Sequence, residues 1–243
     1  MGRGALPMYD LPGVERDVDL LWAAIAERIG ADPVRLRPDD LHRHWRSGAF
    51  VLSQTCGLPL VETLNEVTVV GVFTTAAGVG DGSHYQSVII EPLRPCSGPV
   101  AINSWDSLSG WVSLGCVLTE PWPGDVVLTG GHRMSLREVG AGRASMASLD
   151  AVTLKILSRT EPDLLAAVRV VRPGPLVPCL PLITPDPKNV QGLRTALAAV
   201  VREPALRPSL DRLSITGFVP LDLSAYNEVH KLVTRAKRTL PRP

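Results

Sequence analysis

Apolar and polar residues follow two patterns along this chain, and together these predict helices alternating with short strands. Apolar side chains recur at steps of three and four residues between Val18 and Ile29, which predicts a helix that Gly30 ends. Short apolar runs bounded by turn residues predict strands, and the strongest run covers residues 67–72. Further predicted strands cover residues 6–9, 50–53, 85–90, 100–103, 126–129, 144–149, 168–171 and 180–184.

Helical patterns separate most of these strands, and a final one covers residues 224–238. Such alternation is typical of βαβ units and predicts an α/β fold with mainly parallel sheets. In sheets of this kind, ligands bind beyond the carboxyl ends of the strands, at the N-termini of the following helices. Small polar residues occupy four of the strand-to-helix turns, at residues 53–57, 103–110, 129–132 and 149–150.

The turn from Asn103 to Gly110 is the strongest candidate site. A predicted strand ends at Asn103, and a helix is expected to begin near Ser107 or Ser109. The first N–H groups of a helix have no partner within it and lie at the positive end of its dipole. With the serine hydroxyls, and with Gly110 allowing close approach of the backbone, these groups suit a phosphate, phosphonate or carboxylate. The alternative is that Ser107 only caps the helix.

The turn at residues 53–57 has the same character. The hydroxyls of Ser53 and Thr55 and the amide of Gln54 would complete a cradle for an anion or another polar ligand. The alternative is an ordinary turn in which Gly57 supplies a positive φ.

His132 and Asp150 each follow a predicted strand and stand at the start of a predicted helix. The imidazole of His132 can donate a hydrogen bond to an anion, whereas Asp150 would accept one from a hydroxyl, an amine or a protonated phosphate oxygen. Either residue could instead cap its helix. Tyr9 and Tyr85 could flank a ligand as flat walls with hydroxyl tips, or lie at the edge of the core.

The composition is that of an ordinary globular protein. Of the 243 residues, 45% are hydrophobic and 20% are charged, which excludes the disordered classes. The formal net charge is +1, so we expect no attraction to nucleic acid or to an anionic membrane. No apolar run approaches about 18 residues, so we expect no insertion into a membrane. Because no apolar run of signal-peptide length begins the chain, we expect it in the cytoplasm as given, or in the periplasm if a leader was removed.

The four cysteines and five histidines show no spacing typical of a metal site. The cysteines, at positions 56, 96, 116 and 179, are far apart and are expected as separate thiols in a reducing compartment. The sequence contains no G-x-x-x-x-G-K-[ST] loop, no G-x-S-x-G motif and no H-E-x-x-H motif. We therefore predict no metal, no cofactor and no catalytic residue.

Six motifs follow one another along the chain. They are Leu6-Pro-Met-Tyr-Asp, Leu52-Ser-Gln-Thr-Cys-Gly, Ala101-Ile-Asn-Ser-Trp-Asp-Ser-Leu-Ser-Gly, Gly131-His-Arg-Met-Ser-Leu, Gly142-Arg-Ala and Leu149-Asp-Ala-Val-Thr. With these motifs in this order, the chain resembles the phosphate- and phosphonate-binding components of ABC transporters, which have the type 2 periplasmic-binding-protein fold. The resemblance extends from Leu6 to about Phe218.

The resemblance implies two α/β lobes, joined by two crossover strands, that close on a ligand by a hinge motion. The first lobe would contain residues 1–90 and 184–243, and the second would contain residues 91–183. The crossovers would lie near residues 87–95 and 178–184.

The resemblance also implies roles for the candidate residues. The phosphonate oxygens would be held by the Ser-x-Ser-Gly turn, and His132 would assist. Tyr9 and the loop at residues 53–55 would add contacts, and Asp150 would meet the far end of an amino-phosphonate ligand. The residues of the Ser-x-Ser-Gly turn are Ser107, Leu108, Ser109 and Gly110.

The expected function is therefore the binding of a small oxyanion or organophosphorus ligand, with an ABC transporter or a cytoplasmic protein as partner. The same fold also serves cytoplasmic menaquinone-pathway enzymes that act on small carboxylates, in which case His132 or Asp150 would be a general base. A sensor that reports ligand binding to a protein partner is a third alternative. An enzyme would convert its ligand, whereas a binding protein would release it unchanged.

Overall fold

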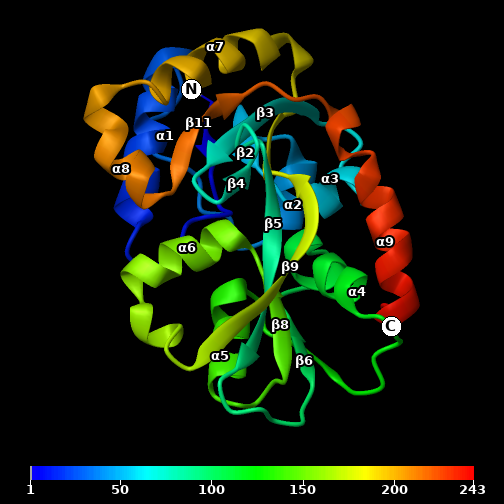
Figure 1. Cartoon of the computed structure of the whole chain (residues 1–243). Helices are drawn as coiled ribbons and strands as arrows, with labels where there is room; N and C mark the ends of the chain where they lie inside the picture. Colours follow the sequence, from blue (N-terminus) through cyan, green and yellow to red (C-terminus); the bar gives the residue numbers. More distant parts are fainter. Residues whose placement is uncertain (1) are drawn as a thin grey trace. The chain divides into compact units, whose positions relative to one another are not determined.

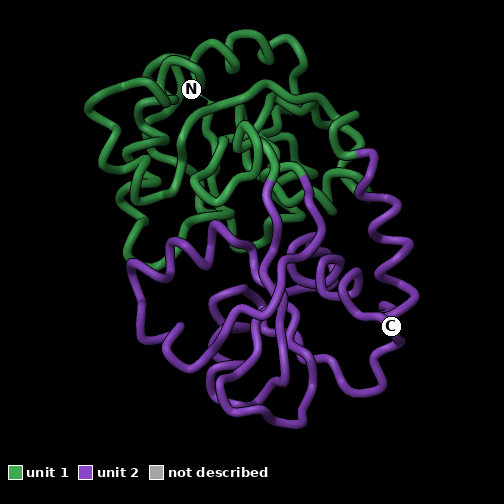
Figure 2. The backbone as a smooth tube through the Cα atoms, in the orientation of Figure 1, with its two compact units in different colours: residues 1–84, 178–226 green, residues 85–177, 227–243 purple. Residues whose placement is uncertain are grey.

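The structure is a computed structural model of the chain, and it describes residues 2–243. It divides into two compact units, which Figure 2 shows in different colours. Unit 1 contains Met1–His84 and Pro178–Tyr226, and unit 2 contains Tyr85–Val177 and Asn227–Pro243. The chain therefore passes from one unit to the other three times, whereas the sequence predicted two crossovers.

Unit 1 is built on a five-stranded sheet in the order β1-β2-β10-β3-β11. Strand β1 is parallel to β2, whereas β10 is antiparallel to both of its neighbours and β11 is antiparallel to β3. The long strand β3 is buried along nearly all of its length, which explains its continuous apolar run. The strands are β1 (Gly4–Ala5), β2 (Leu52–Gln54), β3 (Thr68–Thr75), β10 (Pro181–Thr184) and β11 (Ile215–Val219).

The helices of unit 1 cover this sheet with their apolar faces. Helix α1 buries Val18, Trp22 and Ile25, and it packs against α7 and α8. It ends at Gly30, whose left-handed φ of 66° confirms the predicted stop signal. The helices are α1 (Glu15–Ile29), α2 (Leu41–Ser47), α3 (Gly57–Glu62), α7 (Val190–Val200) and α8 (Arg207–Arg212).

The second sheet has the order β4-β5-β8-β6-β7, and β9 pairs with β5 as well. Strand β6 is parallel to both β7 and β8, so the carboxyl ends of these three strands lie at the same edge of the sheet. Strand β5 runs antiparallel to β8. The strands are β4 (Gly78–Val79), β5 (His84–Pro92), β6 (Val100–Ile102), β7 (Val126–Leu128), β8 (Met146–Leu149) and β9 (Val168–Pro178).

The helices of unit 2 include the last helix of the chain. Helix α9 packs against α4, and Figure 1 shows the two side by side. The contact is close, because a Cβ atom added to Gly115 would lie only 2.8 Å from the Cβ atom of Ala236. A π-helical turn (Leu108–Val112) runs directly into α4. The helices are α4 (Ser113–Val117), α5 (His132–Gly140), α6 (Ala151–Thr160) and α9 (Glu228–Thr239).

The predicted α/β class is confirmed, with three differences. The sheets are mixed instead of mainly parallel, since β5, β10 and β11 each run antiparallel to a neighbour. Residues 227–243 belong to unit 2, whereas the sequence placed them in the first lobe; the apolar face of α9 packs on α4 there. Helix α8 and strand β11 were not predicted, because each is too short to show a clear period.

Candidate functional site

The π-helical turn after β6 forms the centre of the candidate site. Ser107 caps it, because its Oγ accepts a hydrogen bond of 2.9 Å from the N–H of Gly110. Gly110 has no room for a side chain: an added Cβ atom would overlap Oδ1 of Asn103 and lie 3.0 Å from Oγ of Ser107. The capping role of Ser107 is thus confirmed, and the turn keeps its first N–H groups at the carboxyl edge of the sheet.

His132 begins α5 and contacts the same turn. Its Nε2 lies 2.8 Å from Oγ of Ser109, at hydrogen-bond distance. Burial lowers the pKa of His132, and the nearby carboxylate of Asp150 opposes this shift. The imidazole is therefore neutral at neutral pH, so it offers a hydrogen bond instead of a full positive charge.

Ser148, within β8, and Asp150, directly after it, hold the π-helical turn and His132 in place. The hydroxyl of Ser148 donates to the carbonyl of Ser109 at 2.6 Å, so it fixes the backbone of the turn. Asp150 is buried and caps α6, accepting a 2.8 Å hydrogen bond from the N–H of Thr153. The predicted cap at Asp150 is confirmed, and its carboxylate also acts on His132.

Three polar residues thus come together because β7, β6 and β8 are parallel neighbours. Asn103 follows β6, His132 follows β7 after a short turn, and Asp150 follows β8 directly. The expectation that polar residues gather at the carboxyl edge is confirmed for this sheet. Oδ1 of Asn103 is buried, and among the described residues it has no hydrogen-bond partner. We call these residues the carboxyl-edge group: Asn103, Ser107, Ser109, Gly110, His132, Ser148 and Asp150.

Two other predicted residues of unit 2 lie in the core. Leu108 is 2% exposed, so its side chain packs in the interior and only its backbone could meet a ligand. Tyr85 begins the unit 2 part of β5 and is 1% exposed. Its ring belongs to the core, which was the alternative prediction for this residue.

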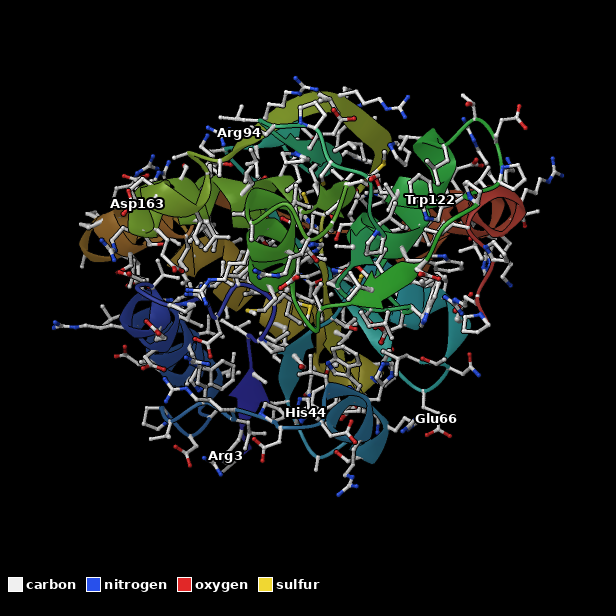
Figure 3. All side chains as sticks on the ribbon, turned by 90° about the horizontal axis from the view of Figure 1, so that it is seen from below. Arg3, His44, Glu66, Arg94, Trp122 and Asp163 are labelled. Carbon is white, nitrogen blue, oxygen red and sulfur yellow. The ribbon has the colours of Figure 1, made fainter. Side chains whose placement is uncertain are left out.

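The residues predicted at positions 53–55 end strand β2 in unit 1. Ser53 and Thr55 are fully buried, and Oγ of Ser53 lies 3.1 Å from Nε2 of His44. Burial lowers the pKa of His44, which α2 carries on its inner face and which Figure 3 labels. The carbonyl of Gln54 accepts a 3.2 Å hydrogen bond from the indole of Trp45. The Ser53 hydroxyl therefore has a partner inside the protein.

Tyr9 lies in the turn after β1 and is 7% exposed. Together with Gln54 it lines a small, largely apolar cavity of about 20 Å³ in unit 1. The next residue, Asp10, is held by two hydrogen bonds of 2.6 and 2.8 Å from the buried guanidinium of Arg35. The sequence did not single out Arg35, because its partners lie far from it along the chain.

The described residues 2–243 include no cluster of three or more side chains that could hold a metal ion. Within the same residues, every helix is too short or too polar to cross a membrane. Within the described part of the chain the four cysteines form no disulfide, and two of them, Cys116 and Cys179, are buried.

A mixed α/β fold in two units matches structures of the periplasmic-binding-protein type. Residues 4–226 match the family described as "ABC transporter, phosphonate, periplasmic substrate-binding protein". The chain belongs to this family, which confirms the resemblance found in the sequence. No curated protein sequence matches the chain.

Solved structures show the same fold at low sequence identity. A binding protein component of an ABC phosphonate transporter from Pseudomonas aeruginosa is 13% identical, with a TM-score of 0.78 over 97% of this chain and 86% of that one. PhnD1 from Prochlorococcus marinus, in complex with methylphosphonate, is 11% identical, with a TM-score of 0.78 over 97% and 98% of the two chains. A Xanthomonas citri protein bound to ATP is 16% identical, with a TM-score of 0.66 over 97% of each chain.

Proposed function

We propose that this chain binds a small phosphorus oxyanion, of the phosphonate or phosphate type, at the carboxyl-edge group of unit 2. The observation that carries the proposal is the contact between Ser109 and His132 beside the amides of a capped, glycine-containing turn. Hydroxyl, imidazole and backbone donors of this kind suit the oxygens of a tetrahedral anion. The family to which the chain belongs and the methylphosphonate bound to one structural neighbour support this choice.

The donors of the group are sufficient for useful affinity. A hydrogen bond to a charged oxygen contributes about 1.5–3 kcal/mol. Four to six such bonds, less the cost of ordering the ligand, correspond to a dissociation constant near 1 μM, or about −8 kcal/mol. No covalent step is involved, so the ligand is released unchanged. The family match does not favour an enzyme that acts on a small carboxylate.

Tyr9 and Gln54 of unit 1 are proposed as further ligand contacts. The sequence resemblance implies ligand contacts at these two positions; the cavity of about 20 Å³ that both line in unit 1 has room for only about one water molecule, so it does not itself hold a ligand. An aromatic wall and an amide suit the non-phosphorus end of a short organophosphonate. We propose Ser53 and Thr55 as supports of this loop, because both are fully buried.

The test is a thermal-shift series with inorganic phosphate, methylphosphonate, sulfate and malate, followed by calorimetry on each anion that stabilises the protein. A ligand that binds only the native state raises the melting temperature as its concentration rises. We expect a phosphorus oxyanion to give the largest shift. Stabilisation by malate alone would favour a carboxylate site, and no shift with either phosphorus compound would refute the proposal.

We propose an ABC transporter as the protein partner, with the chain acting in the periplasm as the family description states. Fractionation of the producing cells tests the location, and uptake of labelled methylphosphonate after deletion of the gene tests the partner. Recovery with cytosolic markers, together with unchanged uptake, would favour the alternative of a cytoplasmic sensor.

A further inference from the structure

The tryptophan that follows the candidate anion turn is tied to the last residues of the chain. Trp111 comes directly after Ser109 and Gly110 in the π-helical turn, and its side chain is fully buried. Its indole N–H donates a 2.8 Å hydrogen bond to the carbonyl of Leu240. The guanidinium carbon of Arg242 lies 3.9 Å from the centre of the Trp111 ring, which is a close cation–π contact.

Helix α9 is fastened to the helix that continues this turn. The hydroxyl of Thr239 donates to the carbonyl of Gly115, and the thiol of Cys116 donates to the carbonyl of Leu232 at 3.3 Å. The N–H of Trp122 donates to the carbonyl of Thr239 at 2.7 Å, and Figure 3 shows Trp122 beside the end of α9. The last helix and the residues after it therefore form one continuous brace, which we call the C-terminal brace (residues 228–242).

The π-helical turn needs such support. A π-helical turn has poorer packing along its axis than an α-helix and is kept by its surroundings, often at functional sites. On one side of the turn, the Ser148 hydroxyl holds the carbonyl of Ser109. On the other side, the C-terminal brace holds Trp111 through Leu240 and Arg242. Ser109 and Gly110 lie between these two attachments.

We propose that the C-terminal brace is a positioning element for anion binding, and that Arg242 and Trp111 are its positioning residues. This inference rests on the proposed function of the carboxyl-edge group. The affinity of a hydrogen-bonded site depends on donors that are already aimed at the ligand before it arrives. Loosening Trp111 frees the backbone at Ser109 and Gly110, so each bound anion must then order the turn again.

The test compares four variants in calorimetric titrations with methylphosphonate, at a temperature at which each protein is fully folded. In Arg242→Ala the cation is removed, in Arg242→Lys the charge is kept without the planar stack, and in Trp111→Phe the N–H donor is removed. Arg94→Ala is the matched control, because Arg94 is an exposed cation of unit 2 that lies outside the C-terminal brace. Hydrogen exchange of residues 108–112 is measured on the same samples.

We expect Arg242→Ala to weaken binding about three- to tenfold and to accelerate exchange at residues 108–112, because each bound anion must then order the loosened turn. Arg242→Lys should recover part of the affinity, and Arg94→Ala should bind like the wild type. A role in stability alone would lower the melting temperature but leave the dissociation constant of the folded protein unchanged, and that result would overturn the inference. If the wild type itself binds no phosphorus oxyanion, the proposed function fails instead.

Discussion

Removing the two side chains that meet at the anion turn tests the assignment of the carboxyl-edge group directly. Ser109→Ala with His132→Ala deletes both partners of the 2.8 Å contact. The turn itself should persist, because Ser148 holds the backbone carbonyl of Ser109 and Ser107 still caps Gly110. The double variant therefore removes donors without removing their scaffold.

The expected loss follows from the number of donors deleted. One hydrogen bond to a charged oxygen is worth about 1.5–3 kcal/mol, which corresponds to about 10- to 150-fold in affinity. Because Ser109 and His132 contact each other, the two single effects should not add. We expect at least a tenfold rise in the dissociation constant for methylphosphonate in the double variant, and a smaller rise in each single variant.

Isothermal titration calorimetry measures this loss, and thermal unfolding checks that each variant is folded. Ser158→Ala is the matched control, since Ser158 is an exposed serine on α6 whose hydroxyl only bonds to the carbonyl of Lys155. Wild-type affinity in the double variant would remove the carboxyl-edge group from the site. An equal loss in the Ser158→Ala control would show that the assay reports stability instead of binding.

Four further predictions concern other parts of the chain. Burial lowers the pKa of His44 in the folded protein, so the neutral imidazole stabilises the fold fully above the pKa of the unfolded chain, near 6.5, and this stabilisation is lost as the pH falls below that pKa. His44→Gln should therefore flatten the fall in melting temperature between pH 7.5 and pH 5.5. His230→Gln, at an exposed position, should not flatten it. Burial raises the pKa of Cys116 to about 11, so a maleimide at pH 8 should label Cys96 well before Cys116, as peptide mapping would show. Arg35→Ala should lower the free energy of unfolding by about 2–4 kcal/mol in urea titrations, since it removes the two hydrogen bonds that Arg35 donates to the part-buried Asp10; no loss of stability would show that the pair contributes nothing net. Because the carboxyl-edge group contains no lysine or arginine, the dissociation constant for methylphosphonate should change less than about threefold between 20 and 200 mM sodium chloride, and a tenfold change would reveal a cationic contact.

Local sequence patterns predicted the parts of the site that depend on local geometry. The sequence offered capping by Ser107 and by Asp150 as the alternative to ligand binding, and both caps are present. The carboxyl edge was predicted as the place of the polar turns, and neighbouring parallel strands bring His132 to Ser109 there. These inferences needed only the period of the apolar residues and the chemistry of helix ends, whereas the contact between His132 and Ser109 was not itself predicted.

Contacts between distant segments could not be predicted in this way. The apolar stripe of α9 showed that one face is buried, but not that its partner is α4. The pairing of Ser53 with His44 depends on how α2 packs on β2, which no local pattern encodes. The sequence offered Ser53 as a ligand contact, and the structure adds His44 as a partner of its hydroxyl.

The proposed site at the carboxyl-edge group would bind an anion without a cationic side chain. Arg133, which follows His132 in the chain, directs its charge to Glu161 at 2.5 Å, and the imidazole of His132 is neutral. Attraction then comes from backbone N–H groups, hydroxyls and the imidazole, whose effect decays quickly with distance and depends on direction. Such a site recognises an anion by the placement of its oxygens more than by its total charge. In the proposed site, a tetrahedral phosphonate, with three oxygens on one phosphorus, would meet donors that follow β6 and β7, whereas a planar carboxylate offers only two oxygens.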